Sequence, residues 1–459
     1  MRLSLCALLL GALPGLAEAA TPRRGPPPPK PPETVWEEGR RDDVVIVKLK
    51  EGVRGVPTMD GAEVRPVFED GAALRALRDE LAPGLADLSL YFRVEVAPGW
   101  GPAVADAFNE QGWVELATLA PEAQPPPMDI PPETPDFSPL QIYPESAPDG
   151  FGVTWARTWP GGAGAGVTVA DLEYGWTAGH EDLIAADAAE TWGFDSGLYE
   201  YHGNGVLGIL FAGDNGYGVT GLVPEATPMV IFPFVEADLY DIAAAIAGAT
   251  TLLGPGDVLL IEQQAYAQGA YCPVEVDQAV FDAISLAVAK GIIVIEPGGN
   301  GAQNLDDPKW GGRFDRAVRD SGAVMVGGGM PPGKDDPART WYPYGGSYGA
   351  RVDVQGWFSD TVTVGSDSAG LNELFFPDSD PNQAYTARFG GTSGASAQLA
   401  GVAGALSAIH LHLHGAPPDP LLVRSWLAAF GTPQPSYDAA NPIGPQPDLG
   451  RVLRMGLLP

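Results

Sequence analysis

The sequence has 459 residues, of which 45% are hydrophobic; this is enough to bury at least one large core and excludes a small disulfide-held scaffold. Acidic residues outnumber basic ones 58 to 26, and the formal net charge of -32 would repel nucleic-acid phosphates and anionic lipid headgroups. Nucleic acid and membrane surfaces are therefore excluded as partners.

Residues 1–20 begin with a basic residue, continue through an apolar stretch too short to span a bilayer and end in small residues of the Ala-x-Ala type. This pattern is typical of a secretory signal peptide. We therefore predict a secreted protein, extracellular or periplasmic. Without the signal, Cys272 is the only cysteine, so the mature chain can form no internal disulfide. No later segment has the roughly 18 continuous apolar residues of a membrane helix.

Two proline-rich linkers, 21–41 and 121–149, enclose a small unit at 42–120. Proline removes backbone donors and favours extended chain, which distinguishes both linkers from the unit between them. Within the unit, apolar residues predict strands at 44–49 and 88–96, and leucines at helical spacing predict a helix between them. We predict a small α/β domain that is independent in composition of the C-terminal part of the chain.

The remainder of the chain, 150–459, alternates short apolar strands with helical segments rich in Ala and Gly. The predicted strands are GVTVAD, MVIFPF, DVLLIEQQ, GIIVIEPGG and AVMVGGG. Continuous apolar strands suit a mostly parallel sheet that helices cover on both faces. We predict a three-layer α/β fold in which reactive groups gather at the carboxyl ends of the strands.

Four polar residues stand at strand ends and helix starts of this predicted domain. They are Asp171 at the end of a strand, His202 at a helix start between glycines, Asn300 in a Gly-rich turn, and Ser393 in the first turn of a helix of small residues. Taken alone, each has a simpler explanation: a polar strand end, a structural histidine, a turn asparagine and a helix cap. Together they place Asp, His and Ser in the chain order of one class of serine protease, with an amide available to an oxyanion.

The segments around these residues resemble the subtilisin-like serine peptidases, or subtilases. The resemblance rests on the Asp171 strand with its following HEDL, HGNGVLG, DNGYGVTGLVPEA, the PGGN turn and GTSGASAQLAG, and it spans residues 150 to about 410. It implies a serine endopeptidase that acts on proteins or peptides and needs no cofactor for catalysis. Its implied site residues are Ser393 as nucleophile, His202 as general base and acid, Asp171 as the group that holds the imidazole, and Asn300 as oxyanion donor.

The resemblance also implies a role for the small domain at 42–120. Secreted subtilases carry an inhibitory propeptide that assists folding, and here it would be cut from the protease between Ala120 and Asp149. The partners are then the protein's own propeptide and its protein or peptide substrates, and we expect a monomer.

Several positions depart from the usual subtilase pattern. Leu172 and Glu173 follow Asp171 where most relatives have a hydroxyl residue and Gly, Asn204 replaces Thr, and Ala397 replaces Pro. The strand VLLIEQQAY replaces the usual Ser-Leu-Gly stretch, so the wall of the substrate pocket cannot be transferred from the family. Because none of the four proposed working residues is lost, an active endopeptidase is favoured over an inactive protein of this fold that binds peptides or partners.

Other residues compete for catalytic or metal-binding roles. A sedolisin-type acid peptidase has Glu in place of the His and Asp in place of the oxyanion Asn, so His202 and Asn300 argue against it. His180 is a weaker candidate for the base, in a predicted loop. The alternating histidines of HLHLH at 410–414 cannot converge on one metal if their segment is helical.

Calcium is the one metal that the resemblance implies, as a structural ion. Subtilases often bind it, and this chain offers pairs of loop carboxylates, which are suitable calcium ligands. The pairs are Glu181 with Asp182, Asp306 with Asp307, and Asp378 with Asp380. Such pairs are also frequent in solvated turns, so both interpretations stay open.

Overall fold

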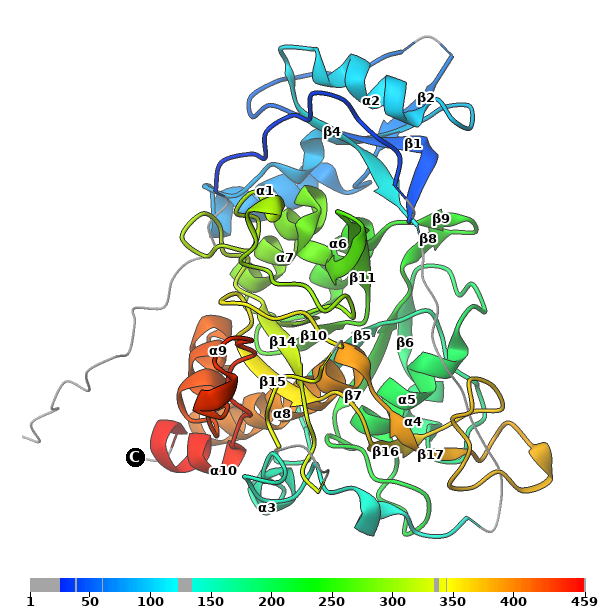
Figure 1. The fold of residues 1–459 in the computed structure, drawn as a ribbon, viewed down its shortest axis with the longest axis vertical. Helices are drawn as coiled ribbons and strands as arrows, with labels where there is room; N and C mark the ends of the chain where they lie inside the picture. Colours follow the sequence, from blue (N-terminus) through cyan, green and yellow to red (C-terminus); the bar gives the residue numbers. More distant parts are fainter. Residues whose placement is uncertain are drawn as a thin grey trace, which may run out of the picture.

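The computed structural model describes residues 25–37, 39–59, 61–122, 134–333, 338–343 and 345–457. The predicted signal peptide at 1–20 lies outside these residues, and so does the 123–133 part of the predicted linker. In the described part of the chain, no helix is long and apolar enough to cross a membrane. The chain forms a small N-terminal unit that rests on a larger one (Figure 1).

The small unit is a four-stranded antiparallel sheet in the order β2-β3-β1-β4 with two helices. Its elements are β1 (Arg40–Leu49), β2 (Glu63–Pro66), α1 (Gly71–Leu81), β3 (Tyr91–Glu95), α2 (Gly101–Asn109) and β4 (Val114–Pro121). Side chains alternate along β1: Val45 and Val47 pack with Phe108 of α2, whereas Ile46 and Lys48 line a cavity shared with the larger unit. The sheet therefore has its own core on one face and contacts the larger unit with the other.

The larger unit is built on a seven-stranded sheet in the order β15-β14-β13-β10-β5-β7-β6, in which all neighbours are parallel. Its strands are β5 (Thr168–Leu172), β6 (Glu190–Trp192), β7 (Thr227–Ile231), β10 (Val258–Ile261), β13 (Ile293–Pro297), β14 (Val324–Gly329) and β15 (Val354–Trp357). The shorter strand pairs are β8 (Phe234–Glu236) with β9 (Leu239–Tyr240), β11 (Gln264–Ala267) with β12 (Ala270–Pro273), and β16 (Thr361–Val364) with β17 (Tyr385–Phe389). The predicted fold class, an α/β protein with a parallel sheet between helices, is confirmed.

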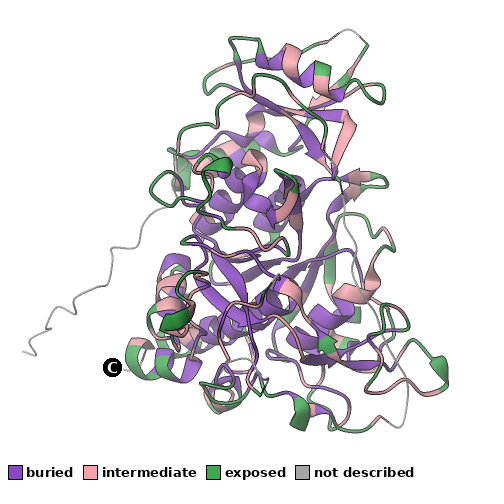
Figure 2. Cartoon of the chain, in the orientation of Figure 1, coloured by how far each residue is buried: buried purple, intermediate pink, exposed green. Residues whose placement is uncertain are grey.

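The helices of the larger unit cover both faces of this sheet. They are α3 (Val153–Ala156), α4 (Ile184–Asp187), α5 (Glu200–Phe211), α6 (Ile242–Leu252), α7 (Gln278–Lys290), α8 (Gly391–His414), α9 (Pro420–Ala429) and α10 (Leu449–Val452). The sheet and the helices packed on it are largely buried (Figure 2). Along β5, Val169 packs on the face of α5 and α8, and Ala170 on the face of α6 and α7. Because the strand period is two residues, Asp171 belongs to the face of α5 and α8.

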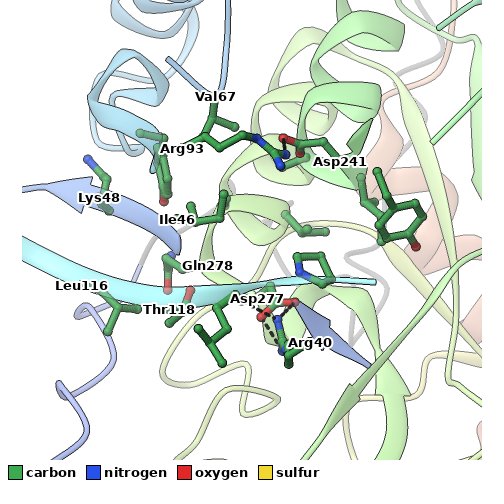
Figure 3. A pocket seen from close by; sticks show the side chains of 18 residues that line it. Arg40, Ile46, Lys48, Val67, Arg93, Leu116, Thr118, Asp241, Asp277 and Gln278 are labelled. Carbon is green, nitrogen blue, oxygen red and sulfur yellow. Dashed lines mark hydrogen bonds and ion pairs between the residues drawn. The ribbon is translucent and has the colours of Figure 1, made fainter. Parts of the chain in front are cut away.

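Charged pairs join the small unit to the starts of α6 and α7 (Figure 3). Arg40 of β1 donates two hydrogen bonds to Asp277, at 3.0 and 2.9 Å, and Arg93 of β3 pairs with Asp241 at 2.7 Å. Asp277 and Asp241 are the residues that precede the first turns of α7 and α6. Basic residues of the small sheet thus face acidic helix starts of the larger unit, so the charges of the two units are complementary where they meet.

Candidate active site

Three of the four predicted working residues line one pocket of the larger unit. His202 lies in the first turn of α5, Asn300 follows β13, and Ser393 lies in the first turn of α8. Other lining residues include Tyr174, Glu262, Gln264, Leu371, Arg388 and Phe389. The turns after β5, β10 and β13 all contribute, so the pocket lies at the carboxyl edge of the sheet, where a parallel sheet is expected to hold its site. Asp171 is not part of the lining.

Two glycines bring Ser393 to this pocket. A Cβ atom on Gly390 would lie 2.2 Å from the carbonyl oxygen of Phe358, and Gly391 has a φ of 78°, so glycine suits both positions. The tight turn lets α8 begin at the pocket. The N–H groups in the first turn of a helix have no acceptor within the helix and carry the positive end of its dipole, so the N–H of Ser393 is available to a negatively charged oxygen.

The side chain of Asn300 is oriented by the residue before Ser393. Its Oδ1 accepts hydrogen bonds from the N–H of Thr392 at 2.8 Å and from the hydroxyl of Thr392 at 3.0 Å. Its backbone N–H donates to Gln264 at 2.9 Å. Since Oδ1 is occupied, Nδ2 is the side-chain group that remains for a substrate oxygen. Nδ2 and the N–H of Ser393 are two donors of the kind that an oxyanion requires.

The residue that holds His202 is Glu173, so the prediction that Asp171 does so is wrong. Nδ1 of His202 forms a short hydrogen bond with Oε2 of Glu173, whose side chain is completely buried. The other carboxylate oxygen of Glu173 accepts from the N–H of Tyr174 at 2.7 Å. Both carboxylate oxygens of Asp171 are buried without a hydrogen-bond partner among the described residues.

Strand geometry explains why Glu173, and not Asp171, contacts His202. β5 runs as far as Leu172, so Asp171 lies inside the strand, and Glu173 is the first residue beyond it on the same face. The start of α5 packs against this point, because a Cβ atom on Gly203 would lie 2.0 Å from the carbonyl oxygen of Gly175. The imidazole therefore lies beside the end of the strand, within reach of the longer side chain. The signal in the sequence was the Asp-Leu-Glu run, whose two acids share one face.

Burial controls the protonation of these side chains. It raises the pKa of Glu173 well above its ordinary value, and burial together with the charge of Glu173 raises the pKa of Asp171. Burial lowers the pKa of His202, although the nearby charge of Glu262 opposes this. A neutral imidazole is the form that can accept a proton from a serine hydroxyl, so the lowered pKa keeps His202 available as a base.

Glu262 provides a second carboxyl group beside the imidazole, and sequence patterns alone did not identify it as a residue of the site. Its Oε2 lies 3.7 Å from Nε2 of His202, and the hydroxyl of Ser396 lies 2.8 Å from its Oε1. Its side chain is completely buried. The sequence did contain a signal, since this acidic residue directly follows the fully apolar strand β10 at the edge of the sheet where sites are expected.

His180, the competing candidate for the base, is a buried structural residue outside the pocket lining. Its ring packs edge-on against Tyr385 with centroids 5.5 Å apart, and its Nδ1 accepts from the N–H of Asp182 at 2.9 Å. Burial lowers the pKa of His180 to about 3, so the ring is neutral.

Asp182 and Asp306, two of the carboxylates considered for calcium, accept hydrogen bonds from protein groups. Asp182 accepts from Asn215 at 2.6 Å, from the N–H of Val219 at 2.8 Å and from Tyr385 at 2.9 Å, and burial raises its pKa to about 7. Asp306 accepts from the backbone of Ala350. In the described ranges, no three or more His, Cys, Asp or Glu residues form a group that could hold a metal ion. Calcium binding stays a prediction.

Asn204, one of the departures from the subtilase pattern, has a structural role. It is completely buried in α5, and its Oδ1 accepts from the N–H of Thr177 at 2.9 Å while its Nδ2 donates to the hydroxyl of Thr177 at 3.2 Å. This side chain ties α5 to the loop that follows β5. It thereby helps to hold His202 beside Glu173.

Comparison with known proteins bears on the fold. No protein-family model matches the chain, and no curated protein matches it in sequence. Fervidolysin from Fervidobacterium pennivorans, a keratinolytic enzyme related to subtilisin, superposes with a TM-score of 0.56 at 15% identity, over 96% of this chain and 65% of its own. The epidermin leader peptide processing serine protease of Staphylococcus aureus gives a TM-score of 0.55 at 14% identity, over 91% of this chain and 99% of its own. The chain thus has the subtilisin-like fold, and it spans about two thirds of the length of fervidolysin.

Proposed function

We propose that the protein is a secreted serine endopeptidase in which Ser393 is the nucleophile, His202 the general base and acid, and Glu173 the carboxylate that holds His202. The solved structures that share this fold include subtilisin-like serine proteases, which supports the proposal at the level of the fold. The observation that carries the proposal is that a buried carboxylate holds Nδ1 of an imidazole that lines one pocket with Asn300 and Ser393.

The proposed reaction uses these groups in sequence. His202 accepts the hydroxyl proton of Ser393 through Nε2 as the serine oxygen attacks the peptide carbonyl. Glu173 keeps the other ring proton on Nδ1 and stabilises the imidazolium, while Nδ2 of Asn300 and the N–H of Ser393 donate to the oxyanion. His202 then gives its proton to the leaving amine. A water molecule, deprotonated by His202, hydrolyses the acyl-enzyme and frees Ser393.

Labelling with a fluorophosphonate, which reacts with activated serines, tests this proposal. We expect the mature protein to be labelled and Ser393→Ala and His202→Ala each to abolish labelling. Ser425→Ala is the matched control and should label like the wild type, because the hydroxyl of Ser425 donates within α9 to the carbonyl oxygen of Leu421 at 2.8 Å, outside the pocket. A folded mature protein that resists the probe would contradict the proposal and favour an inactive protein that binds peptides or partners.

We also propose that the unit at 42–120 is the inhibitory propeptide of this enzyme, removed by self-cleavage between Ala120 and Asp149. The observation that supports this proposal is the contact of the small sheet with α6 and α7 through Arg40 and Arg93. Paired charges and packed side chains can hold the unit in place after the chain is cut. We expect Ser393→Ala to accumulate as the uncut precursor in a host without other proteases. Normal processing of that variant would exclude self-cleavage.

A further inference from the structure

A buried hydroxyl group connects Glu262 to the first turns of α8. The Oγ atom of Ser396 lies 2.8 Å from Oε1 of Glu262, 2.7 Å from the carbonyl oxygen of Thr392 and 3.1 Å from that of Ser393. Ser396 is completely buried, so no solvent contact replaces these partners. Three oxygen atoms thus surround one serine hydroxyl, three residues after the proposed nucleophile.

One hydrogen atom cannot serve all three oxygens. A serine hydroxyl donates one hydrogen bond and accepts up to two, and a backbone carbonyl oxygen only accepts. The arrangement that uses the short contacts has Ser396 donate to Thr392 and accept from Glu262. A carboxyl group donates only when it carries a proton. The hydrogen-bond geometry therefore favours a neutral Glu262 whose O–H points at Ser396.

The charges around Glu262 favour the same state. The groups that face it are His202 of α5 and, from the end of β5, Asp171 and Glu173; Arg388 lines the same pocket but is exposed. The cluster holds three buried carboxyl groups and only one imidazole, so full ionisation would leave buried negative charge uncompensated. Burial raises the pKa of Glu262, the charge of His202 opposes this, and the charges of Asp171 and Glu173 add to it.

On the basis of the proposed function, we propose that Glu262 is a positioning residue that works in its protonated form. Its O–H donates to Ser396 and fixes the turn of α8 that carries Ser393, and its neutral carboxyl group places no negative charge beside Nε2 of His202.

An anion in this place would compete with the nucleophile. Oε2 of Glu262 lies 3.7 Å from Nε2 of His202, which is close enough for an ion pair. An ionised Glu262 would favour a proton on Nε2, and an imidazole that already carries this proton cannot accept the one from Ser393. The neutral carboxyl group leaves Nε2 free, and this is how Glu262 acts through His202.

Two variants separate the neutral form from the anion. Glu262→Gln keeps the length of the side chain and can donate through its amide, whereas Glu262→Met has a similar size and cannot donate. We expect Glu262→Gln to keep kcat within about threefold of the wild type, with the acid limb of the pH profile of kcat/KM unmoved. We expect Glu262→Met to lower kcat by roughly tenfold with little change in KM, because Ser396 loses its donor.

Two outcomes of this comparison would overturn the proposal. Equal losses in both variants, with the acid limb of Glu262→Gln moved to lower pH, would show that Glu262 acts as an anion that raises the pKa of His202. A fully active Glu262→Met would show that the donor is not needed.

Infrared difference spectroscopy tests the protonation without relying on activity. In the Ser393→Ala background, subtraction of the Glu262→Gln spectrum at neutral pH should leave the C=O band of a protonated carboxylic acid. Absence of this band would overturn the proposal. Fluorophosphonate labelling of the wild type is measured in parallel: an unreactive wild type contradicts the proposed function, whereas a reactive wild type without the acid band contradicts only the role of Glu262.

Discussion

The larger unit buries charge in two opposite ways. In the Arg351 cluster, a guanidinium pairs with Glu275 and with Asp353 at 2.8 Å each, and all three side chains are at most 4% exposed. In the His202 cluster, the carboxyl groups of Glu173 and Glu262 lie beside one imidazole, and a third carboxyl group, that of Asp171, is buried close to them. In the first cluster both carboxylates have a cation within hydrogen-bond distance, whereas in the second both oxygens of Asp171 and Oε2 of Glu262 have no hydrogen-bond partner among the described residues.

This difference separates a cluster with a structural role from the cluster for which we propose a catalytic role. Burial acts on both, but in the Arg351 cluster the charge and hydrogen bonds of Arg351, together with the charge of Arg319 and the hydroxyl of Ser321, outweigh burial and lower the pKa of Glu275. In the His202 cluster, burial raises the pKa of Glu173. Matched charges stay ionised and hold elements together, whereas carboxyl groups with raised pKa values beside an imidazole are suited to proton transfer.

The largest expected effect comes from Glu173→Gln. The amide keeps the shape of the side chain but cannot stabilise the imidazolium or enforce the tautomer with a proton on Nδ1, so kcat should fall by about 10³–10⁴-fold. Asp171→Asn is the matched control, because it changes the acid on the same face that does not contact His202, and kcat should change by less than about threefold. Steady-state hydrolysis of a peptide by both variants measures this. A larger loss in Asp171→Asn would restore Asp171 as the working acid.

The choice between these two acids shows what the sequence could not decide. His202, Asn300 and Ser393 are predicted from their joint chain order with Asp171 and from the resemblance of the segments around them to subtilases, and glycines and the ends of apolar runs mark the helix starts and strand ends on which they lie. The acid depends on where β5 ends to within two residues and on how closely α5 packs against Gly175. The apolar pattern gives neither of these, because it extends over several residues and does not fix a strand end to within two positions.

The same limit applies to the fold. Every strand predicted for the large domain is present in the sheet, because central parallel strands are continuous apolar runs. The two outer strands were missed: β6 (Glu190–Trp192) has three residues and is partly exposed, and β15 (Val354–Trp357) reads VQGW, with Gln and Gly interrupting the pattern. In the small domain, the predicted strand at 88–96 starts late, since 88–90 form a turn of 3-10 helix before β3.

Substitution in the Arg351 cluster should lower the stability of the protein. Arg351→Met leaves the buried carboxylate of Glu275 without its hydrogen-bonded cation, whereas Asp353 keeps Arg316, and the free energy of unfolding should fall by roughly 3–5 kcal/mol. Arg451→Met is the control, since Arg451 is 50% exposed and its carboxylate partner Asp448 lies 3.8 Å away, so the loss should stay under about 1 kcal/mol. Chemical denaturation measures both. Equal losses would mean that the buried pairs contribute no more than the exposed one.

The two clusters should also respond to pH in opposite directions. The pKa of Glu275 is lowered in the folded state, so its contribution is present above the unfolded value of about 4.3 and is lost as pH falls through the folded pKa. The pKa of Asp171 is raised, so the folded state binds the extra proton and stability is lost as pH rises from about 3.9 through the folded pKa.

Variants isolate these two contributions. Glu275→Gln should be most destabilising at neutral pH and less so in acid. Asp171→Asn, which mimics the protonated acid, should gain stability relative to the wild type as pH rises. The measurement is the free energy of unfolding of each variant minus that of the wild type across the acid to neutral range. A difference for Asp171→Asn that does not change with pH would show that this carboxyl group titrates normally.

The smallest effect is expected at the contact between the two units, where a buried pair of opposite charges can be compared with an exposed pair. Arg93 and Asp241 are buried at 3% and 9% exposure, whereas Arg65 and Glu95 on the free part of the same sheet are both 34% exposed. Arg93→Met should weaken the contact with the start of α6 by about 1–3 kcal/mol, and Arg65→Met by less than about 1 kcal/mol. In the Ser393→Ala precursor, hydrogen exchange should therefore accelerate in α6 for Arg93→Met only. Equal exchange in both variants would show that packing of β1 and β3 holds the small unit in place, and not its buried charge pairs.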